Sequence, residues 1–283
     1  MTAKDQRYVL LMAKRNRFKT LPVLHEEYNC GRKIKEQVCE TVLRNSLAKN
    51  ALNGRVAAKK PLLRSANIKK RLAFAKAHVD WSEKQWSRVL FTDESKFEFF
   101  GNKRRIYVRR FANERFKNYC LKPTVKHGGG SVMVWGGICV RGVTRLKLIV
   151  GKMDSSAYKT ILQYNVLPDG VRLLGKGFIL QQDNDPKHKE KRVMRYLTNK
   201  ENDGTIKNMI WPPQSPDLNP IEQIWDHLDT SVRRICRLTS RNFFEQLQNC
   251  WHSISRKTLK KYVFSMRDRC LAVIAAKGGH TRF

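Results

Sequence analysis

The sequence changes its hydrophobic period near residue 88, and this change restricts the fold more than any other feature. Before it, apolar residues recur every three or four positions, which is typical of helices. After it, short β-prone runs follow one another at hairpin spacing, namely RVLFTDES, FEFF, RIYVRR, SVMVWGGICV and RLKLIVG. Helix and strand patterns then alternate: a helix over residues 155–167, the strand FILQQD, a helix from Pro186 through Leu197, the polar loop KENDGTIKN, and two or three helices to about residue 276. This order predicts an α/β domain, in which helices flank a mixed, largely antiparallel sheet.

Residues 1–58 predict a small all-α domain. A first helix lies around residues 7–14, Thr20 can cap a second helix, and residues 29–31 supply a turn. A third helix is marked by apolar residues that recur every four positions, at Ile34, Val38 and Val42. This succession is a helix-turn-helix pattern, although a basic helical module that reads no bases would show the same periodicity.

The charge balance predicts a nucleic-acid partner. The chain has 57 Lys and Arg against 24 Asp and Glu, a net charge of +33. Such an excess repels itself unless polyanions accompany it, and its scatter over many segments favours nucleic acid over an anionic membrane. We expect double-stranded DNA to be the partner. The candidate DNA contacts are Arg32, Lys33, Lys35, Arg44, Lys59 and Lys60.

Residues 59–85 predict a basic linker that enters a helix at about Ala66. The clusters Lys59-Lys60-Pro61 and Lys69-Lys70-Arg71 are interpreted as phosphate contacts, as a nuclear import signal, or as a merely solvated charged face. The remaining residues, 86–283, form the α/β domain. No apolar stretch is long enough for a membrane span, and seven cysteines without a Cys-x-x-Cys pair indicate neither a disulfide framework nor a zinc finger. We therefore expect a soluble protein of a reducing compartment and predict the nucleus.

Two acidic residues occupy strand positions that suit a site. Asp93 lies inside VLFTDES, where a buried carboxylate is costly unless it is paired or bound to a cation. Asp183 ends FILQQD, and ligands of α/β folds usually sit beyond the carboxyl ends of strands. Glu94 should face away from Asp93, because side chains alternate along a strand.

Glu222 has two interpretations. In DLNPIE, Asn219 can cap a helix whose third residue is Glu222, so a structural capping box is the simpler one. A glutamate in a first turn can also hold a metal, and the spacing does not decide. Other candidates are Asp185 and Asp217, which are interpreted as turn residues, and Asp226, one helical turn beyond Glu222.

Carboxylates from two strands and a helix start suit a site for two divalent cations. Such cations lie about 3.5–4 Å apart and bridge an attacked phosphate. Oxygen ligands favour Mg²⁺ or Mn²⁺ over zinc. For His188, the alternatives are a contact with a phosphate or a leaving group and a solvated helical histidine, and the second is expected. Trp211 and Trp225 are expected to belong to the core or scaffold and not to stack on bases.

Four blocks of the sequence resemble the Tc/mariner superfamily of DNA transposases. The blocks are VLFTDESKF, GGGSVMVWGGI, QQDNDPKH and WPPQSPDLNPIEQIWDHL, in the family's order, and the resemblance covers roughly residues 5–275. It implies a ribonuclease-H-like catalytic domain behind a paired-type DNA-binding region. It also implies that Asp93, Asp183 and Glu222 form the metal-binding catalytic triad, which reverses the capping-box preference for Glu222.

The resemblance implies cut-and-paste transposition into TA dinucleotides by a dimer that pairs two transposon ends. Two features depart from the family. Asp183 and Glu222 are separated by 38 residues, a few more than is usual, and the first of two helix-turn-helix units is expected to be missing. A catalytically silent DNA-binding relic is therefore one alternative, and a nuclease acting on RNA–DNA hybrids is another.

Overall fold

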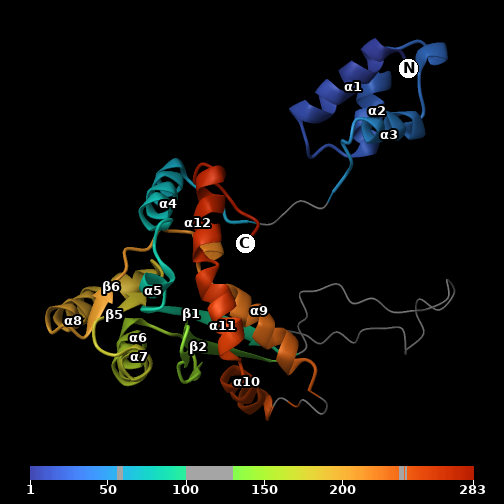
Figure 1. The fold of residues 1–283 in the computed structure, drawn as a ribbon. Helices are drawn as coiled ribbons and strands as arrows, with labels where there is room; N and C mark the ends of the chain where they lie inside the picture. The colour runs from blue at the N-terminus through green and yellow to red at the C-terminus, as the bar shows by residue number, and fades with distance from the viewer. Residues whose placement is uncertain (56–59, 100–129, 236–238, 240) are drawn as a thin grey trace. The chain divides into compact units, whose positions relative to one another are not determined.

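A computed structural model describes residues 1–55, 60–99, 130–235, 239 and 241–283 (Figure 1). The chain divides into two compact units, Met1–Lys60 and Pro61–Phe283. The predicted strand RIYVRR and the candidate DNA contact Lys59 lie outside the described residues. None of the described helices is long and apolar enough to cross a membrane.

The first unit consists of three helices around a small apolar core (Figure 1). They are α1 (Ala3–Arg15), α2 (Leu21–Asn29) and α3 (Glu40–Lys49). α1 begins with a capping box between Thr2 and Asp5, which satisfies backbone donors at the helix start. The core residues shared by the three helices are Val9, Ala13, Leu24, Tyr28, Leu43 and Leu47.

The third helix begins later than the periodicity predicted. Ile34 lies in the short 3₁₀ turn η1 (Ile34–Glu36) with 86% of its surface exposed. Asn29 bonds both backbone groups of Val38, which lies between the extended residues Gln37 and Cys39: its Oδ1 accepts the Val38 N–H at 3.1 Å, and its Nδ2 donates to the Val38 carbonyl at 2.9 Å. These side-chain bonds compete with helical ones, so α3 begins only at Glu40.

The second unit is built on one mixed sheet with strand order β3-β2-β1-β5-β6. The central strand β1 (Val89–Glu98) runs antiparallel to β2 (Ser131–Cys139) and parallel to β5 (Phe178–Gln181). β6 (Ile206–Asn208) pairs in parallel with β5. β2 also pairs with two short strands, β3 (Gly142–Val143) and β4 (Lys147–Ile149).

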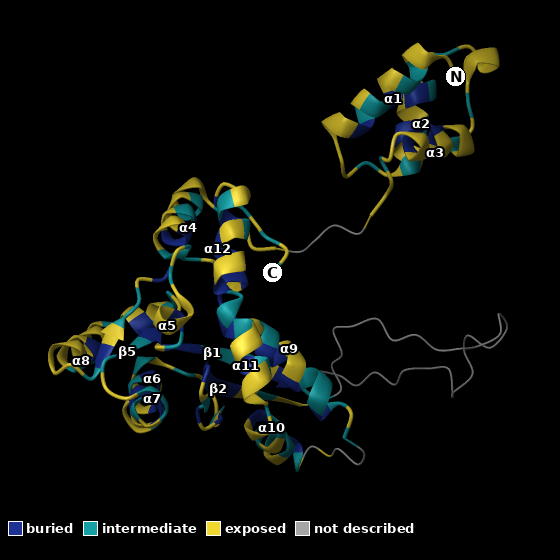
Figure 2. Cartoon of the chain, viewed as in Figure 1, coloured by how far each residue is buried: buried dark blue, intermediate teal, exposed yellow. Residues whose placement is uncertain are grey.

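Helices cover both faces of this sheet, so the second unit has three layers (Figures 1 and 2). β1 alternates between two cores: Val89 and Phe91 belong to one, and Leu90 belongs to the other. The core of Leu90 is closed by α6 (Ser155–Ile161), α7 (Leu167–Leu174) and α8 (Lys191–Asn202). The opposite core is closed by α4 (Ser65–His78), α5 (Glu83–Trp86), α9 (Ile221–Val232), α10 (Phe243–His252), α11 (Arg256–Phe264) and α12 (Met266–Ala275).

Several predicted boundaries in this unit were wrong. RVLFTDES and the start of FEFF form the single strand β1, because its pairing with β2 continues to Glu98. The helix predicted to end at residue 167 continues through the π-helical turn η5 (Leu162–Val166) into α7. The helix predicted from Pro186 is broken at Glu190 between η6 (Pro186–Lys189) and α8, and the loop KENDGTIKN contains the end of α8 and β6.

Candidate active site

Three carboxylates that are far apart in the sequence line one cavity of about 340 Å³. Asp93 lies in the middle of β1, Asp183 follows the carboxyl end of β5, and Glu222 lies in the first turn of α9. Asp93 is half-buried, whereas Asp183 and Glu222 are exposed. The cavity is therefore open to solvent and has an acidic lining.

The parallel pairing of β1 and β5 brings Asp93 and Asp183 to the same place. Phe91 lies opposite Gln181 in the register. Beyond this pair, the Thr92 hydroxyl donates to the Gln181 carbonyl at 2.7 Å, and the Gln181 side chain accepts the Thr92 N–H at 3.1 Å. The bonded residues lie just before the two carboxylates in the chain, so both strand segments are locked in position where the carboxylates project.

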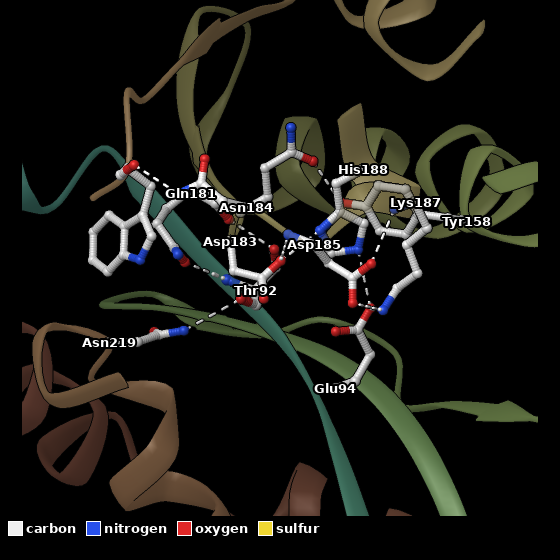
Figure 3. Close-up of polar contacts among 12 residues, drawn as sticks. Thr92, Glu94, Tyr158, Gln181, Asp183, Asn184, Asp185, Lys187, His188 and Asn219 are labelled. Atoms are coloured by element: carbon white, nitrogen blue, oxygen red, sulfur yellow. Dashed lines mark hydrogen bonds and ion pairs between the residues drawn. The ribbon is translucent and has the colours of Figure 1, made fainter. Parts of the chain in front are cut away.

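Asn219 connects the start of α9 to the same strand. Its Nδ2 donates to the Thr92 carbonyl at 3.4 Å, and its Oδ1 accepts the Ile221 N–H at 3.3 Å (Figure 3). Asn219 is buried, and the residue at the cap position of α9 is Pro220. The bonds of Asn219 thus fix the first helical turn, which carries Glu222, against the strand that carries Asp93.

The carboxylates of the cavity repel one another. Burial raises the pKa of Asp93 well above its ordinary value, and the neighbouring charges of Glu222, Glu94 and Asp183 raise it further. A divalent cation at this place would offset the repulsion, and carboxylate oxygens are ligands that Mg²⁺ and Mn²⁺ prefer. The lining therefore fits such cations in its chemistry.

The carboxylates line the cavity without forming a preassembled metal centre. Among the described residues, no group of three or more His, Cys, Asp or Glu side chains is arranged so that it could hold a metal ion.

Asp183 belongs to a cluster of charged side chains that also contains His188, Glu94, Lys187 and Asp185. His188 Nδ1 lies 2.7 Å from Asp183 Oδ1, and His188 Nε2 lies 3.3 Å from Glu94 Oε1 (Figure 3). The Tyr158 ring stacks on the imidazole with 3.8 Å between ring centres. Lys187 completes the group, because its Nζ lies 2.8 Å from Asp185 and 3.7 Å from Glu94.

These contacts set the charges of the group. Burial lowers the pKa of His188, but the contacts with Asp183 and Glu94 outweigh it and raise the pKa to about 9. For Asp183, partial desolvation inside the cavity raises the pKa, yet His188 and the Asp185 amide together bring it below its ordinary value. At neutral pH, a cationic imidazole therefore faces an ionised Asp183.

The prediction of a solvated His188 was wrong, since only 3% of this residue is exposed. Its burial is explained by Tyr158, which reaches His188 from another helix and which no local pattern had indicated. The opposite orientation of Asp93 and Glu94 is confirmed, because Glu94 contacts His188 and Lys187. The supporting residues that sequence reasoning missed are Tyr158, Gln181 and Lys187. Asn219 was expected only as a helix cap and Glu94 only as a carboxylate that faces away from Asp93, so their contacts with Thr92 and His188 were not predicted.

The rival carboxylates have other surroundings. Asp185 accepts the N–H of Lys187 at 3.0 Å, as its turn position predicted. Asp217 lies in a turn, η7 (Pro216–Leu218), but it is buried and paired with Arg71 instead of solvated. Asp226 is exposed on α9 outside the cavity lining. Trp211 and Trp225 are buried, as predicted, although Trp211 also lines the cavity.

The predicted DNA contacts in the first unit differ in their exposure. Lys33, Lys35, Arg44 and Lys60 are exposed. Arg32 is half-buried, pairs with Asp5 at 3.2 Å and lies 4.1 Å from the centre of the Tyr28 ring. Arg32 thus has an intramolecular role in joining α1 to α2.

The chain matches two family models in succession. Residues 6–80 match a model described as "Transposase", and residues 88–243 match a model described as "DDE superfamily endonuclease". The chain is 38% identical over 241 residues to the Transposable element Tc1 transposase of Caenorhabditis elegans, covering 85% of this chain and 87% of the relative. It is 39% identical over 241 residues to the Tcb1 transposase of Caenorhabditis briggsae, with the same coverage.

Solved structures of the Mos1 transposase have a fold similar to that of this chain. The Mos1 transposase paired-end complex with left transposon end has a TM-score of 0.76 at 14% identity, covering 98% of this chain and 80% of that chain. The catalytic domain of Mos1 mariner transposase has a TM-score of 0.60 at 13% identity, covering 80% of this chain and 100% of that chain. The predicted fold, a ribonuclease-H-like domain behind a helical helix-turn-helix region, is confirmed.

Proposed function

This chain belongs to the Tc1/mariner family of DNA transposases, and we propose that it binds terminal inverted repeats, cuts there and joins the freed 3′-hydroxyl ends to target DNA at TA. The observation that carries the proposal is the convergence of Asp93, Asp183 and Glu222 on one solvent-open cavity. Two-metal phosphodiester chemistry uses such an acidic pocket, and the net charge of +33 favours binding of a polyanion such as DNA.

The proposed roles follow from the surroundings of each residue. Asp93, Asp183 and Glu222 would hold two Mg²⁺ or Mn²⁺ ions, which when bound activate the attacking oxygen and stabilise the leaving one. His188 keeps Asp183 ionised and oriented, since its imidazole lies 2.7 Å from the carboxylate. Asn219 keeps the Glu222 turn against β1. The buried Trp211 and the prolines that follow it form one wall of the cavity.

The proposed partner is double-stranded DNA, bound at two transposon ends by a dimer in the nucleus. The exposed cations of the first unit, Lys33, Lys35 and Arg44, would contact phosphates. A solved structure with a similar fold is named the Mos1 transposase paired-end complex with left transposon end. This name supports the proposal that the present chain also binds paired transposon ends.

Cleavage of an end-bearing DNA duplex tests this proposal. With Mg²⁺ or Mn²⁺, the protein should nick the duplex at the transposon end, and Asp183→Asn should lower the rate by at least about 10²-fold. Asp226→Asn is the matched control, because Asp226 is an exposed carboxylate outside the cavity lining. DNA affinity should be unchanged in both variants. Equal cleavage by the wild type and Asp183→Asn would refute the assignment.

A catalytically silent DNA-binding protein is the second candidate. One observation favours it: among the described residues, no group of three or more His, Cys, Asp or Glu side chains is already arranged so that it could hold a metal ion. This protein would bind DNA with strong salt dependence and would leave even pre-nicked substrates uncut in either metal.

A further inference from the structure

A buried arginine, Arg71, bonds two residues that line the cavity. Arg71 in α4 is fully buried, although its cluster Lys69-Lys70-Arg71 was predicted to be a phosphate contact, an import signal or a solvated face. Its two terminal nitrogens donate to the two carboxylate oxygens of Asp217 at 2.7 and 2.6 Å. The prediction for Arg71 was wrong, because its partner lies 146 residues along the chain.

Arg71 also bonds the wall of the cavity itself. Its Nη1 donates to the Gln214 carbonyl at 3.2 Å and to the Ser215 hydroxyl at 2.9 Å. Both residues line the cavity, within the segment Trp211–Pro216. That segment contains Pro212, Pro213 and Pro216, which have no backbone N–H to give to a neighbouring strand or helix. The wall can therefore donate few backbone bonds of its own, and Arg71 of α4 holds it by donating to the Gln214 carbonyl and the Ser215 hydroxyl.

The residues after α12 complete the same cluster. α12 packs beside α4 (Figure 1), and the carbonyls of Gly278 and Gly279 each accept from Arg71 at 3.0 Å. The Thr281 hydroxyl donates to Asp217 at 2.8 Å. A second buried guanidinium, Arg269, donates to the Asp217 carbonyl at 2.5 Å.

The approach of this segment to α4 is close enough to require glycine. A Cβ on Gly278 would lie 2.3 Å from the Ile68 carbonyl oxygen of α4, and the backbone there has a φ of +86°. This close approach therefore fixes how residues 278–281 pack against α4.

We propose that Arg71, Asp217 and residues 278–281 are a positioning device that fixes the Trp211–Pro216 wall and, through it, the first turn of α9. Glu222 lies five residues beyond Asp217, so a displaced wall would move this carboxylate relative to Asp93. A buried ion pair of this kind stabilises a fold little compared with an apolar core, and it is better suited to specifying one arrangement. The inference rests on the proposed function, because the wall matters to activity only if the cavity binds and cuts DNA.

Two matched pairs of variants of the full chain test the proposal. Thr281→Val removes one hydrogen bond to Asp217 and Thr281→Ser retains it. In Gly278→Ala, the added methyl group clashes with the Ile68 carbonyl oxygen. In Gly175→Ala, the methyl group has nothing within 4 Å, and the backbone φ of +79° is similar, so this variant controls for backbone strain. We expect Thr281→Val and Gly278→Ala to speed amide hydrogen exchange in residues 209–224 while β1 stays protected. Thr281→Ser and Gly175→Ala should leave both regions as in the wild type.

Cleavage kinetics give the second measurement. At saturating DNA and Mg²⁺, Thr281→Val should cut roughly tenfold more slowly, as expected for a small displacement of catalytic groups, with the half-saturating DNA concentration unchanged. Unchanged exchange in residues 209–224, or exchange that rises equally in β1, would overturn the proposal. An unchanged cutting rate in a protein whose wall exchanges faster would also overturn it. If the wild type does not cut DNA, the proposed function fails, and the exchange experiment still decides whether the device fixes the wall.

Discussion

His188 combines burial with two acidic neighbours, and this combination makes it the most informative single residue of the site. The imidazole lies between Asp183 and Glu94 and stacks on the ring of Tyr158, and Lys187 approaches the same Glu94 oxygen as the imidazole at 3.7 Å. Both carboxylates favour the protonated imidazole, and they raise the pKa of His188 to about 9. The charge of His188 therefore contributes to the stability of the folded chain.

The stability of the metal-free protein should depend on pH through this residue. Because the folded-state pKa of His188, about 9, exceeds the ordinary value of 6.5, its contribution is fully present below pH 6.5 and is lost as the pH rises through 9. The contribution is on the order of 3 kcal/mol. Urea unfolding in a chelator from pH 6 to 10 should show this loss in the wild type and not in His188→Gln. Parallel pH curves for the two proteins would contradict the prediction.

Predictions for single residues succeeded where the decisive partner was close in the sequence. Strand alternation correctly separated Asp93 from Glu94, and the turn bond of Asp185 to Lys187 spans two residues. The same reasoning failed for Arg71, because the carboxylate that buries it comes from a distant segment. No local pattern distinguishes such an arginine from its solvated neighbours.

At the scale of elements, β2 owes its close fit to two consecutive glycines. Gly136 lies opposite Asp93 in the register, and the stacked rings of Trp225 and Trp251 lie over it. A Cβ at Gly136 would lie 2.8 Å from Trp225 and 2.9 Å from Trp251. The bare backbone of β2 thus lets α9 and α10 approach the sheet.

Gly136→Ala should destabilise the second unit by about 1–3 kcal/mol, the usual cost of overpacking a core. Urea unfolding followed by circular dichroism measures this loss. Gly54→Ala is the control, since a Cβ at Gly54 would meet nothing within 4 Å. Equal midpoints for the two variants would show that the tryptophans move aside freely.

The late start of α3 gives a second prediction about an element. Asn29→Ala removes both bonds to Val38. The Val38 carbonyl keeps its contact with His25 Nε2 at 2.7 Å, but the partly buried Val38 N–H loses its bond to Asn29, which should cost about 1 kcal/mol. We expect faster hydrogen exchange in α3 and weaker DNA binding. Asn53→Ala, at an exposed position of the same unit, should change neither. If α3 exchanges no faster in Asn29→Ala, these bonds do not define its start.

The type of most long elements followed from hydrophobic period, but their ends, and therefore their exact number, did not. The apolar spacing of Ile34, Val38 and Val42 fits a helix, yet the side chain of Asn29 bonds both backbone groups of Val38, which lies outside any helix. Likewise, β6 lies in a segment too polar to be recognised as a strand, and it exists because β5 offers it a parallel edge. Such boundaries are decided by tertiary partners.

At the scale of the whole molecule, we expect the net charge of +33 to dominate the affinity for DNA and its dependence on salt. Binding that neutralises several phosphates releases counterions, so affinity for a duplex should fall by about 10³-fold or more between 50 and 200 mM salt. Fluorescence anisotropy measures this slope. A chelator should leave the affinity unchanged while abolishing cleavage, and an affinity independent of salt would contradict a phosphate-dominated interface.

The pairing of β1 with a distant strand also has a consequence for biosynthesis. The first unit is complete by Lys60, so it can fold while later residues are still being translated. Thr92, in contrast, bonds Gln181, 89 residues further along the chain. Until the ribosome has released that far segment, β1 has an uncovered edge that invites aggregation and chaperone binding. A nascent chain thus acquires its helix-turn-helix module well before the cavity lined by Asp93, Asp183 and Glu222.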